Sequence, residues 1–189
     1  MQSYEKRNIP DLITNLESPE IFHFVKNSKK VNYSGNLQER IDFCKYRDHV
    51  IKFIISSYYV LKDKIETQIE RFDGNEQLEL DERQNFLDEK SQKELEKQAL
   101  LIAGVLENKD ITKLDVFLLD SLVNIADDVE ETERLVGFIS KKNHIQYHQL
   151  LNLKAFSNRF IQTIEDFQGL RKLNQKFYIK LLEIQDLSL

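Results

Sequence analysis

One stretch of the sequence, residues 36–72, decides the fold. It reads Asn-Leu-Gln-Glu-Arg-Ile-Asp-Phe-Cys-Lys-Tyr-Arg-Asp-His-Val-Ile-Lys-Phe-Ile-Ile-Ser-Ser-Tyr-Tyr-Val-Leu-Lys-Asp-Lys-Ile-Glu-Thr-Gln-Ile-Glu-Arg-Phe. Asn36 and Glu39 have the spacing of a capping box, which predicts a helix start, and Gly74 can end the helix in a left-handed conformation. Steps of four and three residues define a mostly apolar seam: Leu37, Ile41, Cys44, Asp48, Ile51, Ile55, Tyr58, Lys62, Ile65, Ile69 and Phe72. This spacing is typical of a helix packed as in a coiled coil.

Helical patterns continue on both sides of this stretch. Pro10 and Pro19 indicate two short N-terminal helices, with Ser18 as the cap of the second, and residues 27–35 have the composition of a loop. Residues 76–97 predict a largely solvated helix, and residues 99–106 are apolar on every side, so we expect that end to be buried all round. Thr112 and Asp115 suggest another capping box. A helical stripe follows to Lys142, and a turn is expected near Asn143.

The final stripe predicts a helix of more than about 40 residues. It consists of Leu153, Phe156, Phe160, Ile164, Phe167, Leu170, Phe177, Leu181 and Ile184. We therefore predict an all-α protein, a bundle of about four long amphipathic helices with coiled-coil-like seams, preceded by two short N-terminal helices. Residues 1–35 would form a short helical arm and a loop, and the arm could dock onto another subunit. Residues 36–189 would form the bundle. An extended coiled-coil dimer is the competing architecture.

Composition restricts the class of protein. The chain of 189 residues is 41% hydrophobic and 31% charged, which is too apolar for a disordered chain and too charged for a membrane span. It contains 2 prolines and 5 glycines, so long helices can continue without interruption. One cysteine, Cys44, allows no intramolecular disulfide, and the N-terminus has no secretory pattern. These features predict a cytoplasmic protein, or a nuclear one if the source is eukaryotic.

Charge is distributed unevenly along the chain. Residues 63–136 carry 9 basic and 21 acidic side chains, whereas residues 137–180 carry 8 basic and 2 acidic ones. The two segments can neutralise each other by packing together, or one can face a partner of opposite charge. The candidate interaction residues in the basic segment are Lys154, Arg159, Arg171, Lys172 and Lys176. Aromatic residues lie between them, as in proteins that bind single-stranded nucleic acid, but at core spacing, so nucleic acid is an unfavoured partner.

The weak candidates for metal ligands lie in two groups. Asp120, Asn124, Asp128 and Glu131 share one side of a helix and carry the oxygen atoms that Mg²⁺ prefers, while His144 and His148 are four residues apart. The stretch Asp110–Glu130 resembles the acidic metal-binding helices of PhoU-like phosphate-transport accessory proteins, which implies a metal site there. That family has paired acidic helices, and no second copy of the motif occurs here. A solvated acidic helix face produces the same pattern, so we expect no bound metal or cofactor.

Motifs for nucleotide or acyl chemistry are missing from the sequence. It contains no glycine-rich phosphate loop, no Gly-x-Ser-x-Gly and no pair of Glu-x-x-His motifs. Cys44 lies on the apolar seam, so we expect a buried thiol rather than a nucleophile. The sequence favours a non-enzymatic adaptor, scaffold or assembly subunit that binds another protein chain or itself. A metal- or ligand-binding regulatory bundle is the first alternative, and RNA or single-stranded DNA binding by the C-terminal helix is the second.

Overall fold

The computed structural model describes residues 18–27, 36–72, 89–108 and 111–187, and every regular element in these ranges is an α-helix. They are α3 (Pro19–Asn27), α4 (Leu37–Phe72), α5 (Glu89–Asn108), α6 (Ile111–Ser140) and α7 (Tyr147–Leu187). The predicted all-α class is confirmed. The helix expected at Pro10 and the first part of the helix expected over residues 76–97 lie outside the described residues.

Two predicted helix caps are present. The backbone N–H of Gln38 donates to Asn36 Oδ1 at 2.8 Å, and the N–H of Ile21 donates to Ser18 Oγ at 3.3 Å. Each bond satisfies a donor that has no partner within the first turn of a helix. Because α4 runs without a break from its cap to Phe72, the quoted stretch forms one helix of 36 residues. The final helix, α7, has 41 residues, and the predicted turn separates it from α6.

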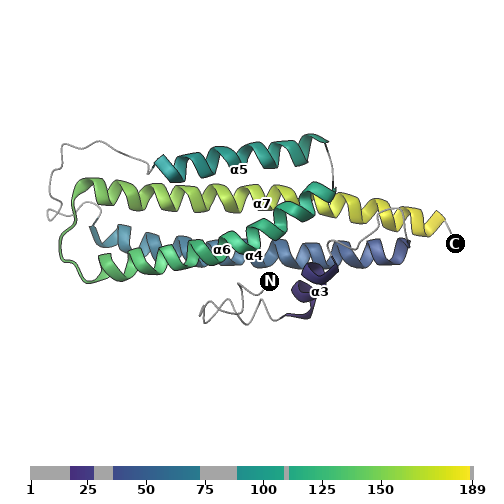
Figure 1. Cartoon of the computed structure of the whole chain (residues 1–189), viewed down its shortest axis with the longest axis horizontal. Helices are drawn as coiled ribbons and strands as arrows, with labels where there is room; N and C mark the ends of the chain where they lie inside the picture. The colour runs from purple at the N-terminus through teal and green to yellow at the C-terminus, as the bar shows by residue number, and fades with distance from the viewer. Residues whose placement is uncertain (1–17, 28–35, 73–88, 109–110, 188–189) are drawn as a thin grey trace.

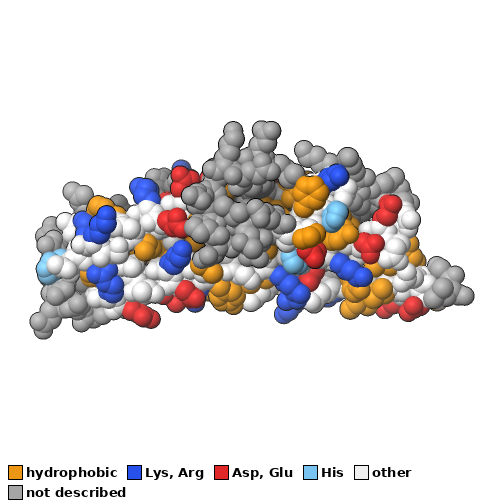
Figure 2. Space-filling model, turned by 90° about the horizontal axis from the view of Figure 1, so that it is seen from below, with side chains coloured by type: hydrophobic (Ala, Val, Ile, Leu, Met, Phe, Trp, Pro, Cys, Tyr) orange, Lys and Arg blue, Asp and Glu red, His pale blue; other side chains and the backbone are white. Residues whose placement is uncertain are grey.

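Helices α4 and α7 form the long axis of an elongated molecule (Figures 1 and 2). They run antiparallel, since Arg47 contacts Asn174 at one place and Glu66 contacts Ser157 further along. Helix α6 runs parallel to α4, with Asp115 bonded to Arg47 and Asp128 bonded to Tyr58. Helix α5 packs along α7 and α6, on the far side of α7 from α4, and α3 packs on α4.

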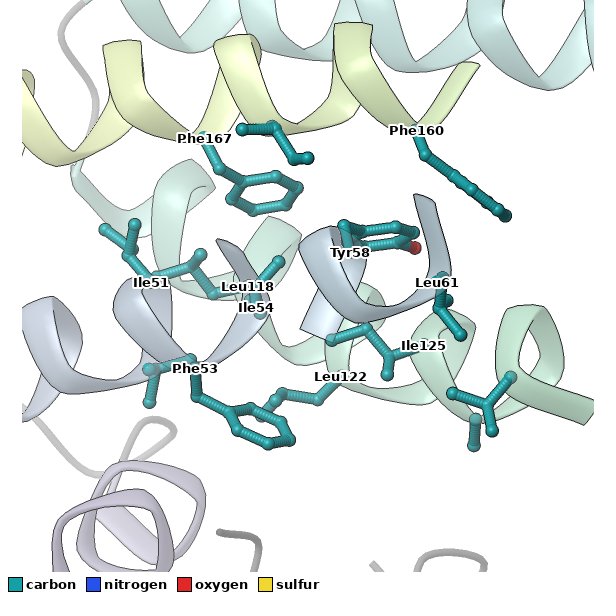
Figure 3. Packing of buried hydrophobic residues seen from close by; sticks show 14 of the residues in the cluster. Ile51, Phe53, Ile54, Tyr58, Leu61, Leu118, Leu122, Ile125, Phe160 and Phe167 are labelled. Carbon is teal, nitrogen blue, oxygen red and sulfur yellow. The ribbon is translucent and has the colours of Figure 1, made fainter. Parts of the chain in front are cut away.

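The core lies where α4, α6 and α7 meet. Figure 3 shows Ile54 of α4 close to Leu118 of α6, with Phe167 of α7 above them, and Leu61 of α4 close to Ile125 of α6. Helix α4 buries residues on more than one side because it packs against α3, α6 and α7. Each buried aliphatic or aromatic side chain stabilises the fold by about 1.5–3 kcal/mol relative to an exposed one. The apolar seam of α4 predicted this burial, although it did not show which helices provide the cover.

The prediction that residues 99–106 are buried all round is wrong for the side chains that the structure describes. Leu100 is 75% exposed, and Leu101 and Ala103 are also exposed, whereas Ile102 is 5% exposed. The reason is that α5 lies on the outside of α7 and is covered along one side only. A fully apolar stretch therefore does not establish complete burial.

None of the described helices is long and apolar enough to cross a membrane.

We expect Leu118→Ala to lower the free energy of unfolding by about 2–5 kcal/mol, because Leu118 is fully buried among α4, α6 and α7. Val116, two residues earlier on the same helix, is exposed, so Val116→Ala is the matched control and should change the value by less than about 0.5 kcal/mol. Urea unfolding followed by circular dichroism measures both. Equal effects would contradict the assignment of α6 to the core.

Candidate interaction surface

A buried arginine joins three helices. Arg47 of α4 donates from Nε to Asp115 Oδ1 at 2.6 Å and from Nη2 to Asp115 Oδ2 at 3.2 Å, so the pairing with α6 is bidentate. Its Nη1 donates to Asn174 Oδ1 of α7 at 2.9 Å. Asn174 Nδ2 in turn donates to the backbone oxygen of Cys44 at 3.0 Å. Because each side chain satisfies another, this cluster fixes the register of α4, α6 and α7.

Burial destabilises the charged forms of both Arg47 and Asp115. Loss of water raises the pKa of Asp115 to about 8 and lowers the pKa of Arg47 to about 10. The bidentate contact acts in the opposite direction, because each charge stabilises the other at short range. The guanidinium also lies 5.0 Å from the centre of the Phe43 ring. The pair is therefore stable only while both members are present.

The expected capping box of Thr112 and Asp115 is wrong. Helix α6 already includes Ile111, and both carboxylate oxygens of Asp115 accept from Arg47. The sequence spacing suits a cap, but it carries no information about an arginine 68 residues earlier in the chain. The carboxylate of Asp115 instead forms a long-range ion pair with Arg47.

A second buried cluster uses two of the predicted site residues. Asp128 accepts from the Tyr58 hydroxyl at 2.5 Å and from Arg159 Nη2 at 3.0 Å, and both charged side chains are buried. The Arg159 guanidinium lies 4.8 Å from the centre of the Phe160 ring. Asp128 and Arg159, predicted from the sequence as a metal ligand and an interaction residue, thus bond to each other in the interior between α6 and α7.

The other metal candidates are not brought together. Asp120 is exposed on α6, Glu131 is half-buried there, and His144 lies in the link before α7. His148 is in the first turn of α7, so the two histidines do not share a continuous helix. Among the residues that the structure describes, no group of three histidine, cysteine or acidic side chains could hold a metal ion.

The remaining basic candidates follow α7 toward its C-terminus. Lys154 is half-buried, and Arg171 donates to Asp48 Oδ1 of α4 at 2.9 Å, where Lys52 also pairs with Asp48. Lys172 and Lys176 are exposed, as is Lys180 one turn later. None of these three lysines has an ion-pair partner within the described part of the chain.

Among the helices that the structure describes, α4 and α7 are the two that continue far past the Arg47 cluster. Residues 37–46 of α4 and 175–187 of α7 extend beyond the ends of α5 and α6, and we call this pair the two-helix tip (Figure 1). Gln185 Nε2 donates to Gln38 Oε1 at 3.1 Å and joins the pair near its end. Ile41, Cys44 and Leu181 form a small separate core inside the tip. Helix α3 packs on α4 beside this region through Phe24 and Phe43.

Apolar side chains remain uncovered on the tip. Ile179 is 53% exposed, Ile184 is 48% exposed, and Leu187 is exposed as well. Figure 2 shows hydrophobic, basic and acidic side chains together at this end of the molecule. Within the described ranges, α5 covers α7 nearer its middle, and no described helix covers α7 in the same way at the tip. Two helices alone bury only the sides that face each other, so the opposite side of α7 is left exposed there.

Of the tip residues, only Lys176 was among the interaction residues predicted from the sequence. Ile184 was predicted in the core stripe of the last helix, and Ile179 was not among the candidates. One signal was available, because the apolar stripe continues to Ile184, whereas α6 begins at Ile111, one turn before the Asp115 that shares Arg47 with Asn174 of α7. Recognising it requires the register of the helices, which the sequence pattern does not contain.

No protein-family model, curated protein or solved structure matches this chain.

We expect Arg47→Met to lower the free energy of unfolding at pH 7 by about 3–5 kcal/mol, because it leaves the Asp115 carboxylate buried without its partner. The double variant Arg47→Met/Asp115→Leu should recover most of this loss. A pH series adds a second test. In Arg47→Met, burial keeps the pKa of Asp115 raised above its ordinary value of 3.8, and no guanidinium opposes that shift. The folded state then binds a proton that the unfolded state releases, so stability should fall as pH rises from the ordinary pKa of an aspartate into the neutral range.

An Arg47→Met variant as stable as the double variant, with stability independent of pH over this range, would contradict the buried pair. Arg171→Met is the matched control, because its pairing with Asp48 is partly exposed. It should lower the free energy of unfolding by no more than about 1 kcal/mol.

We expect the thiol of Cys44 to resist alkylation in the folded protein. It is buried, and burial raises its pKa above the ordinary value of 9.0, so little thiolate forms near neutral pH. Labelling with iodoacetamide followed by mass spectrometry should show modification only after urea unfolding. Rapid modification of the native chain would show that α4 and α7 separate readily at this position.

Proposed function

We propose that the chain is a non-enzymatic interaction module, an adaptor, scaffold or assembly subunit, that binds another protein chain through the two-helix tip. The observation that carries this proposal is the exposure of Ile179 and Ile184 on a helix pair that no third long helix accompanies among the described elements. Exposed apolar groups rimmed by charge are typical of surfaces that other proteins cover.

The rest of the described structure suits a rigid support for that surface. The Arg47 and Asp128 clusters use their polar atoms for bonds between helices, and the apolar core holds α4, α6 and α7 together. The long antiparallel pair of α4 and α7 then holds the tip in a defined orientation. A surface that is organised before binding loses less conformational entropy when the partner arrives.

The predicted four-helix bundle with coiled-coil-like seams is part of the same proposal. We propose that a closed four-helix arrangement with coiled-coil-like seams forms at the tip when a partner contributes the missing helices. The described part of the N-terminal arm is a weaker candidate contact. Ile21 and Phe24 of α3 are buried against the chain's own core.

Site-specific photocrosslinking tests the proposed function. Benzoylphenylalanine replaces Ile179 in the full chain, and the matched control carries it at Phe138, which has nearly the same exposure but lies at the other end of α6. After irradiation in cells, we expect a discrete product heavier than the 22.5 kDa chain from position 179 and none from position 138. Addition of Ile184→Lys should remove that product, because a lysine replaces an apolar contact beside it.

Two results would contradict the proposal. One is a product of equal yield from both positions, which indicates random collision. The other is the absence of any product from position 179 while the chain is folded and abundant. The mass of a discrete product then separates a second copy of this chain from a different protein.

A further inference from the structure

We infer that the partner of the two-helix tip is a second copy of this chain, bound antiparallel along α7 about a two-fold axis. This inference rests on the proposed function, since it names the partner of the same surface. The observation that supports this inference is the order of the charged and apolar residues on the exposed side of α7.

The exposed side of α7 in the tip is continuous. At about 100° of rotation per residue, Ile179, Lys180, Glu183 and Ile184 lie within an arc of about 140°. Leu181 and Asn174, which face α4, lie on the opposite side of the helix. A second helix can therefore pack against these four residues without displacing α4.

The order of these residues is complementary to itself when reversed. In an antiparallel pair related by a two-fold axis, residues equidistant from the midpoint face each other. With the midpoint between Leu181 and Leu182, Ile179 faces Ile184 of the second copy, and Lys180 faces Glu183 of the second copy. The same midpoint places Lys176 opposite Leu187, next to Asp186. One register thus satisfies both the apolar and the charged pairs.

The charged side chains on this face of α7 lie at the surface. Lys176, Lys180 and Glu183 are exposed, and none has an ion-pair partner in the part of the chain that is described. The two apolar positions on the same face are about half exposed. Association of two copies would cover both isoleucines and place each lysine near an acidic side chain of the other copy. Because the two copies are related by a two-fold axis, each of these contacts would occur twice.

The second copy would also complete the tip. Two tips packed together bring four helix segments to one place, two from α4 and two from α7. Leu37, Tyr178 and Leu182, which are partly buried beside the small core of Ile41, Cys44 and Leu181, lie at the edge of this arrangement. Four helices can enclose a core that two helices leave open.

Charge exchange at one pair tests the inference. Sedimentation velocity over a concentration series measures the dimer dissociation constant of the full chain, with 22.5 kDa as the monomer mass. Lys180→Glu and Glu183→Lys should each weaken the dimer by about tenfold or more, since each places like charges opposite each other twice. The double variant Lys180→Glu/Glu183→Lys should restore the wild-type dissociation constant to within about threefold, since it exchanges the charges without changing their number.

Lys172→Glu is the matched control, because Lys172 is exposed on the same helix but lies farther from the midpoint. It should change the dissociation constant less than Lys180→Glu does. Circular dichroism and the melting temperature establish that each variant folds, as expected for exposed positions.

Three results would overturn the inference: a wild-type monomer at every concentration, a dimer insensitive to both single variants, or single variants whose combination fails to restore association. A monomer that still gives a crosslinked product with a different protein at position 179 would remove the second copy as partner and leave the proposed function in place. Loss of both readouts would remove the proposed function too.

Discussion

The Arg47 guanidinium is the contact on which the arrangement of the long helices depends. It is fully buried on α4, and it bonds to Asp115 of α6 and Asn174 of α7 at the same time. A buried charge is tolerated only when its partners are placed accurately, so the cluster penalises any shift of these helices along one another. It also lies one turn after the start of α6, near the place where α4 and α7 become the only long helices that the structure describes.

Local signals predicted the helices well. Asn36 and Ser18 cap helices where the sequence places them, and the rarity of proline and glycine allows α4 and α7 to run for 36 and 41 residues. These features act within a few residues of the chain, so a single sequence reveals them. The turn between α6 and α7 belongs to the same class, since it follows the paired lysines at residues 141 and 142.

Contacts between distant segments were not predictable in the same way. Asp115 resembles a capping residue until Arg47 is placed beside it, and Asp128 resembles a metal ligand until Arg159 and Tyr58 occupy its oxygens. Leu100 resembles a core residue because its neighbours are apolar, yet α5 lies outside α7. In each case the amino-acid type is compatible with several environments, and the packing of helices decides among them. The candidate surface at Ile179 and Ile184 depends on that packing as well.

The proposed interface follows from the same geometry, because the helix pair that supports the tip is fixed by the buried cluster at its base. Amide hydrogen exchange, measured at low and high protein concentration, tests this most directly. We predict slower exchange at high concentration over residues 175–187 of α7, with unchanged exchange over residues 147–160, where a second copy would make no contact. Identical exchange of both segments at the two concentrations would contradict the association of two tips.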